Sequence, residues 1–142
     1  MTPADVQAWL DRYLAAWASY DAAAIGDLFT DDVVYRFHPS DDGFVGREAV
    51  VAAWLEPEGD ASSRDEAGTW EARYVPFIVA GDRAVAVGWS RYYVDPSRST
   101  VQRVWDNAYL LEFGPDGRCR SFTEFYVPRP ADRLDRQPPL VG

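Results

Sequence analysis

Lysine is absent from the 142 residues, and histidine and cysteine occur once each, as His38 and Cys119. Without lysine, the chain cannot form a Schiff base, use a lysine nucleophile or bind phosphate through a P-loop lysine. A single cysteine excludes an internal disulfide and a zinc site of several thiolates, and a single histidine excludes sites that need two imidazoles. We therefore expect neither a metal nor a cofactor.

Positive charge is also scarce, because 14 Arg face 23 Asp and Glu and give a formal net charge of −9. Such a surface repels phosphate backbones, so nucleic acid is not an expected partner. No cationic leader precedes an apolar run, and no apolar stretch approaches the roughly 18 residues that span a bilayer. We expect a cytoplasmic protein without a membrane partner.

Aromatic residues are abundant, with six Trp, eight Tyr and seven Phe. The length suits one domain, and so many bulky side chains must form a core or line a pocket. The domain is expected over residues 1–127. Residues 128–142 form a proline-rich tail without periodicity, which we expect to lie outside the core.

Helical spacing is confined to the first part of the chain. Thr2 before Pro3 is typical of a helix start, and apolar residues then recur every three or four positions up to Trp17. Two more helices are expected over residues 22–29 and 46–55.

Strand patterns dominate the rest of the chain. Alternation predicts a strand over residues 33–38, and residues 56–68 have the composition of a surface loop. An antiparallel meander follows, with strands at residues 69–79, 84–94, 100–113 and 118–127. Three helices before a meander predict an α+β fold with the helices on one face of the sheet.

The strand at residues 100–113 carries apolar side chains on both faces. Trp105 and Tyr109 lie on one face, and Val104 and Leu110 lie on the other. An antiparallel sheet that is apolar on both faces commonly buries the second face against another copy. We therefore expect a homodimer through the outer face of the sheet.

Four segments resemble the nuclear transport factor 2-like superfamily, and within it the SnoaL-like and ketosteroid-isomerase-like branch. They are LDRYLAAW at residues 10–17, DAAAIGDLFTDDV at 21–33, GREAV at 46–50 and FGPDGR at 113–118. The resemblance implies a cone-shaped roll in which helices and a curved, mostly antiparallel sheet enclose a cavity for a small apolar molecule. It also implies that homodimers are common.

The resemblance does not imply one reaction, because the superfamily includes isomerases, aldol cyclases related to polyketide biosynthesis, dehydratases, epoxide hydrolases and members without chemistry. It places Tyr13 at the position of an oxyanion-stabilising tyrosine, although Tyr13 also fits a purely structural role in the core. The ketosteroid isomerases of this branch also need two aspartates, whose positions correspond here to Phe37 or His38 and to Tyr109. Neither position carries an acid. The true ketosteroid isomerase reaction is therefore not expected.

Glu124 is the acid that the pattern singles out. The final strand directs Phe122, Glu124 and Tyr126 toward the cavity, and a lone carboxylate among aromatic rings suits a general acid or base. The alternative is a structural ion pair with Arg103. An arrangement like that of the epoxide hydrolases would need a second acid two residues beyond the arginine, where Trp105 stands.

His38 is the only side chain with an ordinary pKa near neutrality, which suits a general base. Strict alternation places it away from the face of Tyr35 and Phe37, although a bulge before Pro39 would turn it inward. The alternative is a histidine at the end of a strand, bonded to the neighbouring loop.

Two hypotheses follow. In the first, the protein is a cofactor-independent isomerase, cyclase or hydratase/hydrolase that acts on a small, apolar, oxygenated molecule, with Glu124, His38 and Tyr13 as catalytic residues. In the second, it is a non-catalytic domain for ligand binding or homodimerisation. Under both, the expected ligand-binding residues are Arg103, Trp105, Asn107, Tyr109, Phe37, Trp54, Phe122 and Tyr126.

Overall fold

The computed structural model describes residues 1–56 and 64–136 and places three helices against a six-stranded sheet. The helices are α1 (Pro3–Ser19), α2 (Ala22–Gly26) and α3 (Arg47–Leu55). The strands are β1 (Phe29–Arg36), β2 (Phe44–Val45), β3 (Trp70–Ala80), β4 (Arg83–Tyr93), β5 (Val101–Phe113) and β6 (Cys119–Pro128), and a short 3-10 helix, η1 (Ala131–Arg133), follows. The α+β prediction is confirmed. Part of the expected loop, residues 57–63, and the end of the tail, residues 137–142, lie outside the described residues.

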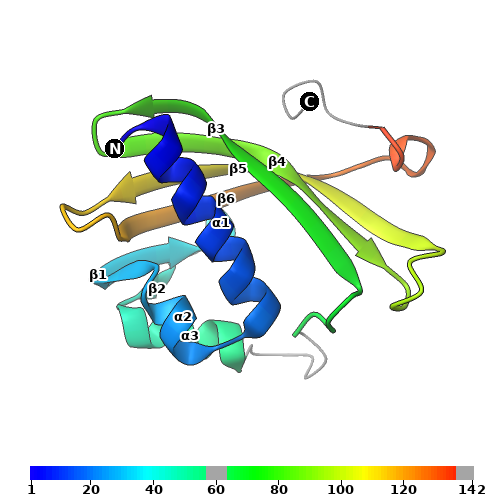
Figure 1. Cartoon of the computed structure of the whole chain (residues 1–142), viewed down its shortest axis with the longest axis horizontal. Helices are drawn as coiled ribbons and strands as arrows, with labels where there is room; N and C mark the ends of the chain where they lie inside the picture. Colours follow the sequence, from blue (N-terminus) through cyan, green and yellow to red (C-terminus); the bar gives the residue numbers. More distant parts are fainter. Residues whose placement is uncertain (57–63, 137–142) are drawn as a thin grey trace.

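The sheet has the order β2-β1-β6-β5-β4-β3. Strands β3 to β6 form the predicted antiparallel meander, and β1 joins it in parallel alongside β6. Figure 1 shows α1 running across the sheet, with α2 and α3 grouped beside β1 and β2. One face of the sheet, the inner face, therefore lies beneath the helices, and the other, the outer face, lies away from them.

Helix α1 begins where the sequence predicts. The Thr2 hydroxyl accepts a hydrogen bond from the Asp5 amide at 3.1 Å, and the Asp5 carboxylate accepts one from the Thr2 amide at 2.8 Å, which completes a capping box. The indole N–H of Trp9 donates to the carbonyl of Leu28 at 3.0 Å and ties the helix to the start of β1. In residues 1–56 and 64–136, no helix has the length and hydrophobicity needed to cross a membrane.

Two expected boundaries are wrong around β1. The helix predicted over residues 22–29 ends at Gly26, because Phe29 already pairs with Cys119 of β6. The strand predicted to reach His38 ends at Arg36, which leaves Phe37 and His38 beyond the sheet. Pairing with a strand 90 residues away overrides the local helical pattern, and local propensity cannot report such a partner.

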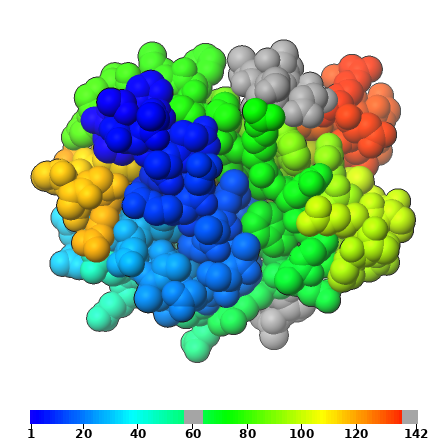
Figure 2. Space-filling model, in the orientation of Figure 1, coloured from blue at the N-terminus to red at the C-terminus, as the bar shows by residue number. Residues whose placement is uncertain are grey.

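The described part of the tail packs on the outer face of the sheet. Leu134 contacts a small hydrophobic cluster around Trp89 and Val104. The buried guanidinium of Arg129 pairs with Asp106 of β5 at 2.9 Å. Figure 2 shows this segment, in red, at the opposite end of the molecule from the β5–β6 hairpin, in orange. That the tail contributes little to folding stays a prediction.

A patch of apolar side chains remains exposed on the outer face, beyond the segment that the tail covers. Leu110 is 46% exposed, although it lies in the middle of β5. The other members of this patch are Ile78, Phe125 and Val127. Exposed apolar side chains gathered on one sheet face are typical of a surface that another protein covers.

We predict that wild type is a homodimer and that Leu110→Arg is a monomer, because the new charge would be buried against a second copy. Light scattering on an eluting peak at micromolar concentration measures the mass, which is 16.0 kDa for one chain. Val45→Arg, in the exposed edge strand β2, is the control and should leave the dimer intact. A wild-type mass of one chain would contradict the prediction.

Gly88 of β4 leaves room for the backbone of Arg73 and the ring of Tyr74 on the neighbouring strand β3. A Cβ atom at this position would lie 1.9 Å from the carbonyl oxygen of Arg73 and 2.5 Å from a ring carbon of Tyr74. We predict that Gly88→Ala lowers the free energy of unfolding by about 1–3 kcal/mol or more, since overpacking a sheet or core usually costs this much. Denaturant titration measures the change. Gly26→Ala, where the nearest atom is 3.5 Å away, is the control and should be neutral or stabilising.

Candidate functional site

A cavity of about 230 Å³ lies between α1, α3 and the inner face of the sheet. Its walls are mostly aromatic, as is usual for sites that bind small molecules. Two carboxylates and one serine add polar groups. The lining residues are Tyr13, Trp17, Tyr20, Tyr35, Phe37, Ala53, Trp54, Asp65, Tyr74, Ser90, Tyr92, Tyr109 and Glu124.

Glu124 reaches the cavity from the inner face of β6. Its carboxylate accepts a hydrogen bond from the side-chain amide of Asn107 at 3.1 Å, and the Asn107 oxygen accepts one from the Ser90 hydroxyl at 3.2 Å. Burial raises the pKa of Glu124 to about 7, and the hydrogen bond from Asn107 opposes this rise. A carboxyl with this pKa is present in both protonation states near neutrality, so it can accept or donate a proton.

Arg103 does not form the ion pair with Glu124 that was the alternative expectation. Strand register places Arg103 opposite Tyr92, whereas Glu124 lies opposite Tyr109, about 20 Å further along β5. The Arg103 guanidinium instead lies 4.1 Å from the centroid of the Tyr92 ring and donates to the side chain of Gln102. In the part of the chain that the structure describes, no ion pair involves Glu124.

Four buried tyrosines surround Glu124. The rings of Tyr74 and Tyr109 are 4.8 Å apart, and those of Tyr13 and Tyr109 are 5.8 Å apart. The hydroxyl of Tyr13 lies close to those of Tyr35 and Tyr109. Burial, and then the charges of neighbouring groups, raise the pKa of all four phenols well above the usual value. These hydroxyls therefore stay protonated and can donate hydrogen bonds to a negative oxygen.

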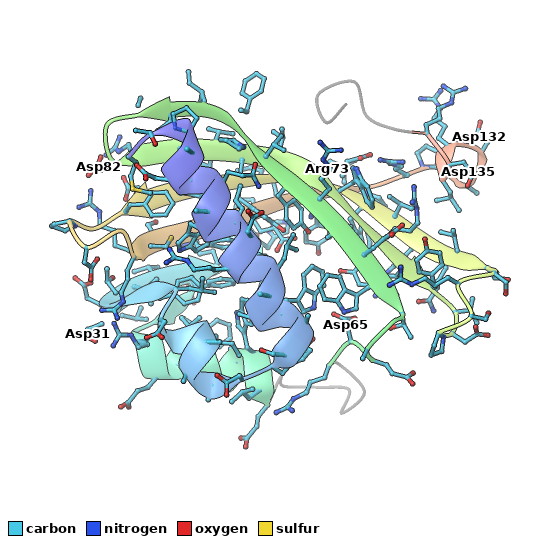
Figure 3. All side chains as sticks on the ribbon, in the orientation of Figure 1. Asp31, Asp65, Arg73, Asp82, Asp132 and Asp135 are labelled. Carbon is cyan, nitrogen blue, oxygen red and sulfur yellow. The ribbon has the colours of Figure 1, made fainter. Side chains whose placement is uncertain are left out.

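Asp65 is a second carboxylate of the cavity, and the sequence analysis did not identify it. It lies on the loop before β3, near the end of α1 (Figure 3), where it accepts hydrogen bonds from the Trp17 indole at 2.9 Å and the Tyr20 hydroxyl at 3.4 Å. Burial raises its pKa, and the bond from Trp17 and the charge of Arg103 oppose the rise. The segment around Asp65 has no helical or strand periodicity that could have identified it. The only residue of this part of the cavity that the sequence pattern placed on an inner face was its partner Trp17, on the predicted apolar stripe.

Trp54 and Phe37 line the cavity as the sequence analysis expected. Trp54 is 8% exposed and packs edge-on against Tyr13, with the ring centroids 5.4 Å apart. Its indole N–H lies close to the hydroxyl of Tyr35 but has no partner with hydrogen-bond geometry among the described residues. Phe37 follows β1 and packs edge-on against Tyr35 at 4.7 Å.

His38, Trp105 and Tyr126 do not line the cavity. His38 is exposed, and its Nδ1 lies 2.7 Å from the Ser40 hydroxyl, which corresponds to the alternative of a histidine bonded to the neighbouring loop and not to an inward-turned base. Its ring is 6.1 Å from that of Tyr126, which packs edge-on against Trp105 at 5.0 Å. These three rings gather beyond the cavity because β1 ends at Arg36 while β5 and β6 continue alongside each other.

Phe122 and Asn107 act from behind the cavity wall. Phe122 is fully buried in the main core, where it stacks on Tyr35 with the ring centroids 4.3 Å apart. Asn107 is buried and is linked to the cavity through its hydrogen bonds with two lining residues, Glu124 and Ser90. Neither side chain is among the lining residues.

The single thiol of the chain, Cys119, is not among the lining residues. Burial raises the pKa of the Cys119 thiol to about 12, so it is not a thiolate at neutral pH. Among residues 1–56 and 64–136, no three His, Cys, Asp or Glu side chains gather into a group that would hold a metal ion. The chemistry of the described site therefore rests on carboxyls, phenols and indoles.

Solved structures with the same fold include three that align over most of this chain. An NTF-2 like protein of unknown function from Burkholderia xenovorans LB400 has 17% identity and a TM-score of 0.61, with 91% of this chain and 90% of that chain covered. An LEH-like epoxide hydrolase from M. tuberculosis has 12% identity and a TM-score of 0.60, with 88% and 84% covered. A putative calcium/calmodulin-dependent protein kinase type II association domain from Thiobacillus denitrificans ATCC 25259 has 19% identity and a TM-score of 0.62, with 83% and 91% covered.

At these identities the three structures show a shared fold and nothing finer. A comparison with curated protein sequences gave no match. The model of the SnoaL-like domain matches residues 10–122, which include all three helices in part or whole and most of the sheet. The chain therefore belongs to the SnoaL-like domain family.

Proposed function

We propose that the cavity binds a small, largely apolar molecule that carries oxygen, and that Glu124 transfers a proton to or from it. The observation that carries this proposal is a carboxyl buried among phenols, held by one neutral amide and, among residues 1–56 and 64–136, paired with no cation. A carboxyl needed only for structure would gain more from an arginine partner than from an aromatic wall.

The phenols would stabilise the negative charge that this proton transfer creates on the ligand. When Glu124 removes a proton from a carbon beside a carbonyl group, negative charge develops on the carbonyl oxygen, and the hydroxyls of Tyr13 and Tyr109 can donate hydrogen bonds to it. The same groups can protonate a leaving oxygen and activate water. Isomerisation, cyclisation and hydration or hydrolysis all fit this set.

A second candidate function is ligand binding without chemistry. His38, the other expected base, lies outside the cavity, so Glu124 has no imidazole to share the proton with. In this case the phenols only line a binding pocket. Proton exchange on a bound probe separates the two candidates.

We predict that Glu124→Gln leaves the stability at neutral pH unchanged or raises it by roughly 1–2 kcal/mol, since the amide avoids burying a charge. Burial raises the pKa of Glu124 from 4.5 to about 7 in the folded chain. The folded state therefore holds the proton more tightly, and wild type loses stability as pH rises from about 4.5 to about 7. Denaturant titrations at several pH values measure this slope, which Glu124→Gln should reduce.

Glu66→Gln is the matched control, because Glu66 is exposed and its side chain makes no hydrogen bond in the described structure. It should keep the wild-type slope. A loss of several kcal/mol in Glu124→Gln at neutral pH would contradict the proposal, because it would show that the fold depends on the charge of Glu124.

We predict that the protein exchanges the α-protons of a small cyclic ketone such as cyclohexanone with deuterium from the solvent, as followed by NMR. Glu124→Gln should abolish the exchange, because the amide cannot accept the proton. Tyr13→Phe should slow it about 100-fold or more, because the oxyanion loses a donor. Tyr93→Phe, outside the cavity, is the control and should exchange at the wild-type rate.

No exchange above background for any ketone in a panel of ring sizes that fit the cavity would favour ligand binding without chemistry. Exchange that survives Glu124→Gln would remove Glu124 as the base.

A further inference from the structure

The charges in the cavity do not balance. Asp65 and Glu124 both line it, and no Arg or His is among the lining residues. The chain has no lysine, and its one histidine, His38, is exposed beyond the end of β1 and does not line the cavity. Two cations lie against cavity-lining rings: Arg103 is 4.1 Å from the centroid of Tyr92, and Arg64 is 5.4 Å from that of Tyr20. Among the described residues, neither arginine lines the cavity or makes an ion pair with either carboxylate. A ligand that enters as an anion would meet two carboxyls and no positive partner.

The aromatic walls favour a positive charge. Trp17, Tyr20 and Tyr92 line the cavity close to Asp65, and indole and phenol faces attract cations. One of these rings already attracts a cation, because the Arg103 guanidinium lies 4.1 Å from the centroid of the Tyr92 ring. The ring faces and the carboxylates thus act in the same direction on a ligand.

An independent observation indicates a second feature of the ligand. Trp54 lines the cavity, and its buried indole N–H, which lies close to the Tyr35 hydroxyl, has no partner with hydrogen-bond geometry among the described residues. Buried donors rarely remain unsatisfied in a complete site. The missing group is an acceptor, and an oxygen atom on the ligand would supply it.

We propose that the molecule bound in this cavity is a small organic cation, a substituted ammonium that also carries an oxygen acceptor for Trp54. This inference rests on the proposed function in that the same cavity receives the same molecule. It names the substrate class: amino alcohols and amino ketones fit, and carboxylates and phosphates do not. The formal net charge of −9 would also draw a cation toward the protein at low salt.

Three probes of matched shape test the charge. The cation is choline. The uncharged probe is 3,3-dimethylbutan-1-ol, in which a tert-butyl group replaces trimethylammonium, and the anion is the carboxylate 3,3-dimethylbutanoate. Calorimetry at low salt and about pH 8, above the pKa of about 7 of Glu124, measures their affinities. Choline should bind at least about 10-fold more tightly than the alcohol, and the anion should not bind. Equal or tighter binding of the alcohol or the anion, or no binding of choline at millimolar concentration, would overturn the proposal.

Variants locate the effect in the cavity. Asp65→Asn and Glu124→Gln should each weaken choline about 10-fold and leave the alcohol unchanged, because each removes one carboxylate. Arg103→Gln should strengthen choline, since it removes a positive charge near Asp65. Asp42→Asn, at an exposed aspartate, loses the same net charge and should bind choline as wild type does.

The two proposals can fail separately. If the alcohol binds best while ketone exchange still requires Glu124, the proton transfer stands and the cationic ligand does not. If choline binds best and no ketone exchanges, the site is a cation-binding pocket without chemistry. If Asp65→Asn does not fold, Glu124→Gln alone tests the role of the carboxylates. Unchanged choline affinity in Glu124→Gln would then count against the proposal.

Discussion

The stacking of Phe122 is the interaction on which the rest of the structure depends. Its ring lies parallel to Tyr35 at 4.3 Å, stacks with Tyr13 at 5.7 Å and packs against Tyr109 at 4.8 Å. These rings come from β6, β1, α1 and β5, so one buried side chain holds the helix layer to the strands. Burial of such large apolar surfaces supplies most of the stabilisation in a small domain.

The same packing leaves a cavity rather than a filled core. Large flat rings meet edge-on as well as in parallel, and their hydroxyl ends converge on one region from different elements. Gly88 contributes by allowing Tyr74 to lie against β4 without a clash. Polar ends collected in this way need partners, and the hydrogen-bonded chain of Ser90, Asn107 and Glu124 provides some of them.

The proposed chemistry depends on two carboxyls that, among the described residues, have no cationic partner. Glu124 is buried, yet the neighbouring strand offers it an amide and not a guanidinium, so its proton is held near neutrality. Asp65 meets an indole and a phenol, with Arg103 acting only from a distance. Both carboxyls therefore keep a capacity for ligand or proton that a salt bridge would have used. The proposed proton transfer and the proposed cationic ligand rest on this same imbalance.

Local patterns in the sequence determined the capping box of α1, its apolar stripe and the four-stranded meander, because these depend on residues close in the chain. They also identified Glu124, since a carboxylate among aromatic residues is visible from alternation alone. Tyr13, Trp54, Tyr109 and Phe37 were expected at the cavity on the same kind of evidence, with the family resemblance, and all four line it.

Only the tertiary structure decided which groups meet. Face alternation put Arg103 and Glu124 on one side of the sheet, but the register between β5 and β6 separates them and brings Asn107 to Glu124 instead. The end of β1 at Arg36 left His38 outside, and Asp65 entered the cavity from a loop without any pattern. Register, strand ends and loop placement are determined by contacts between segments that are distant in the chain. Local periodicity in the sequence does not report those contacts.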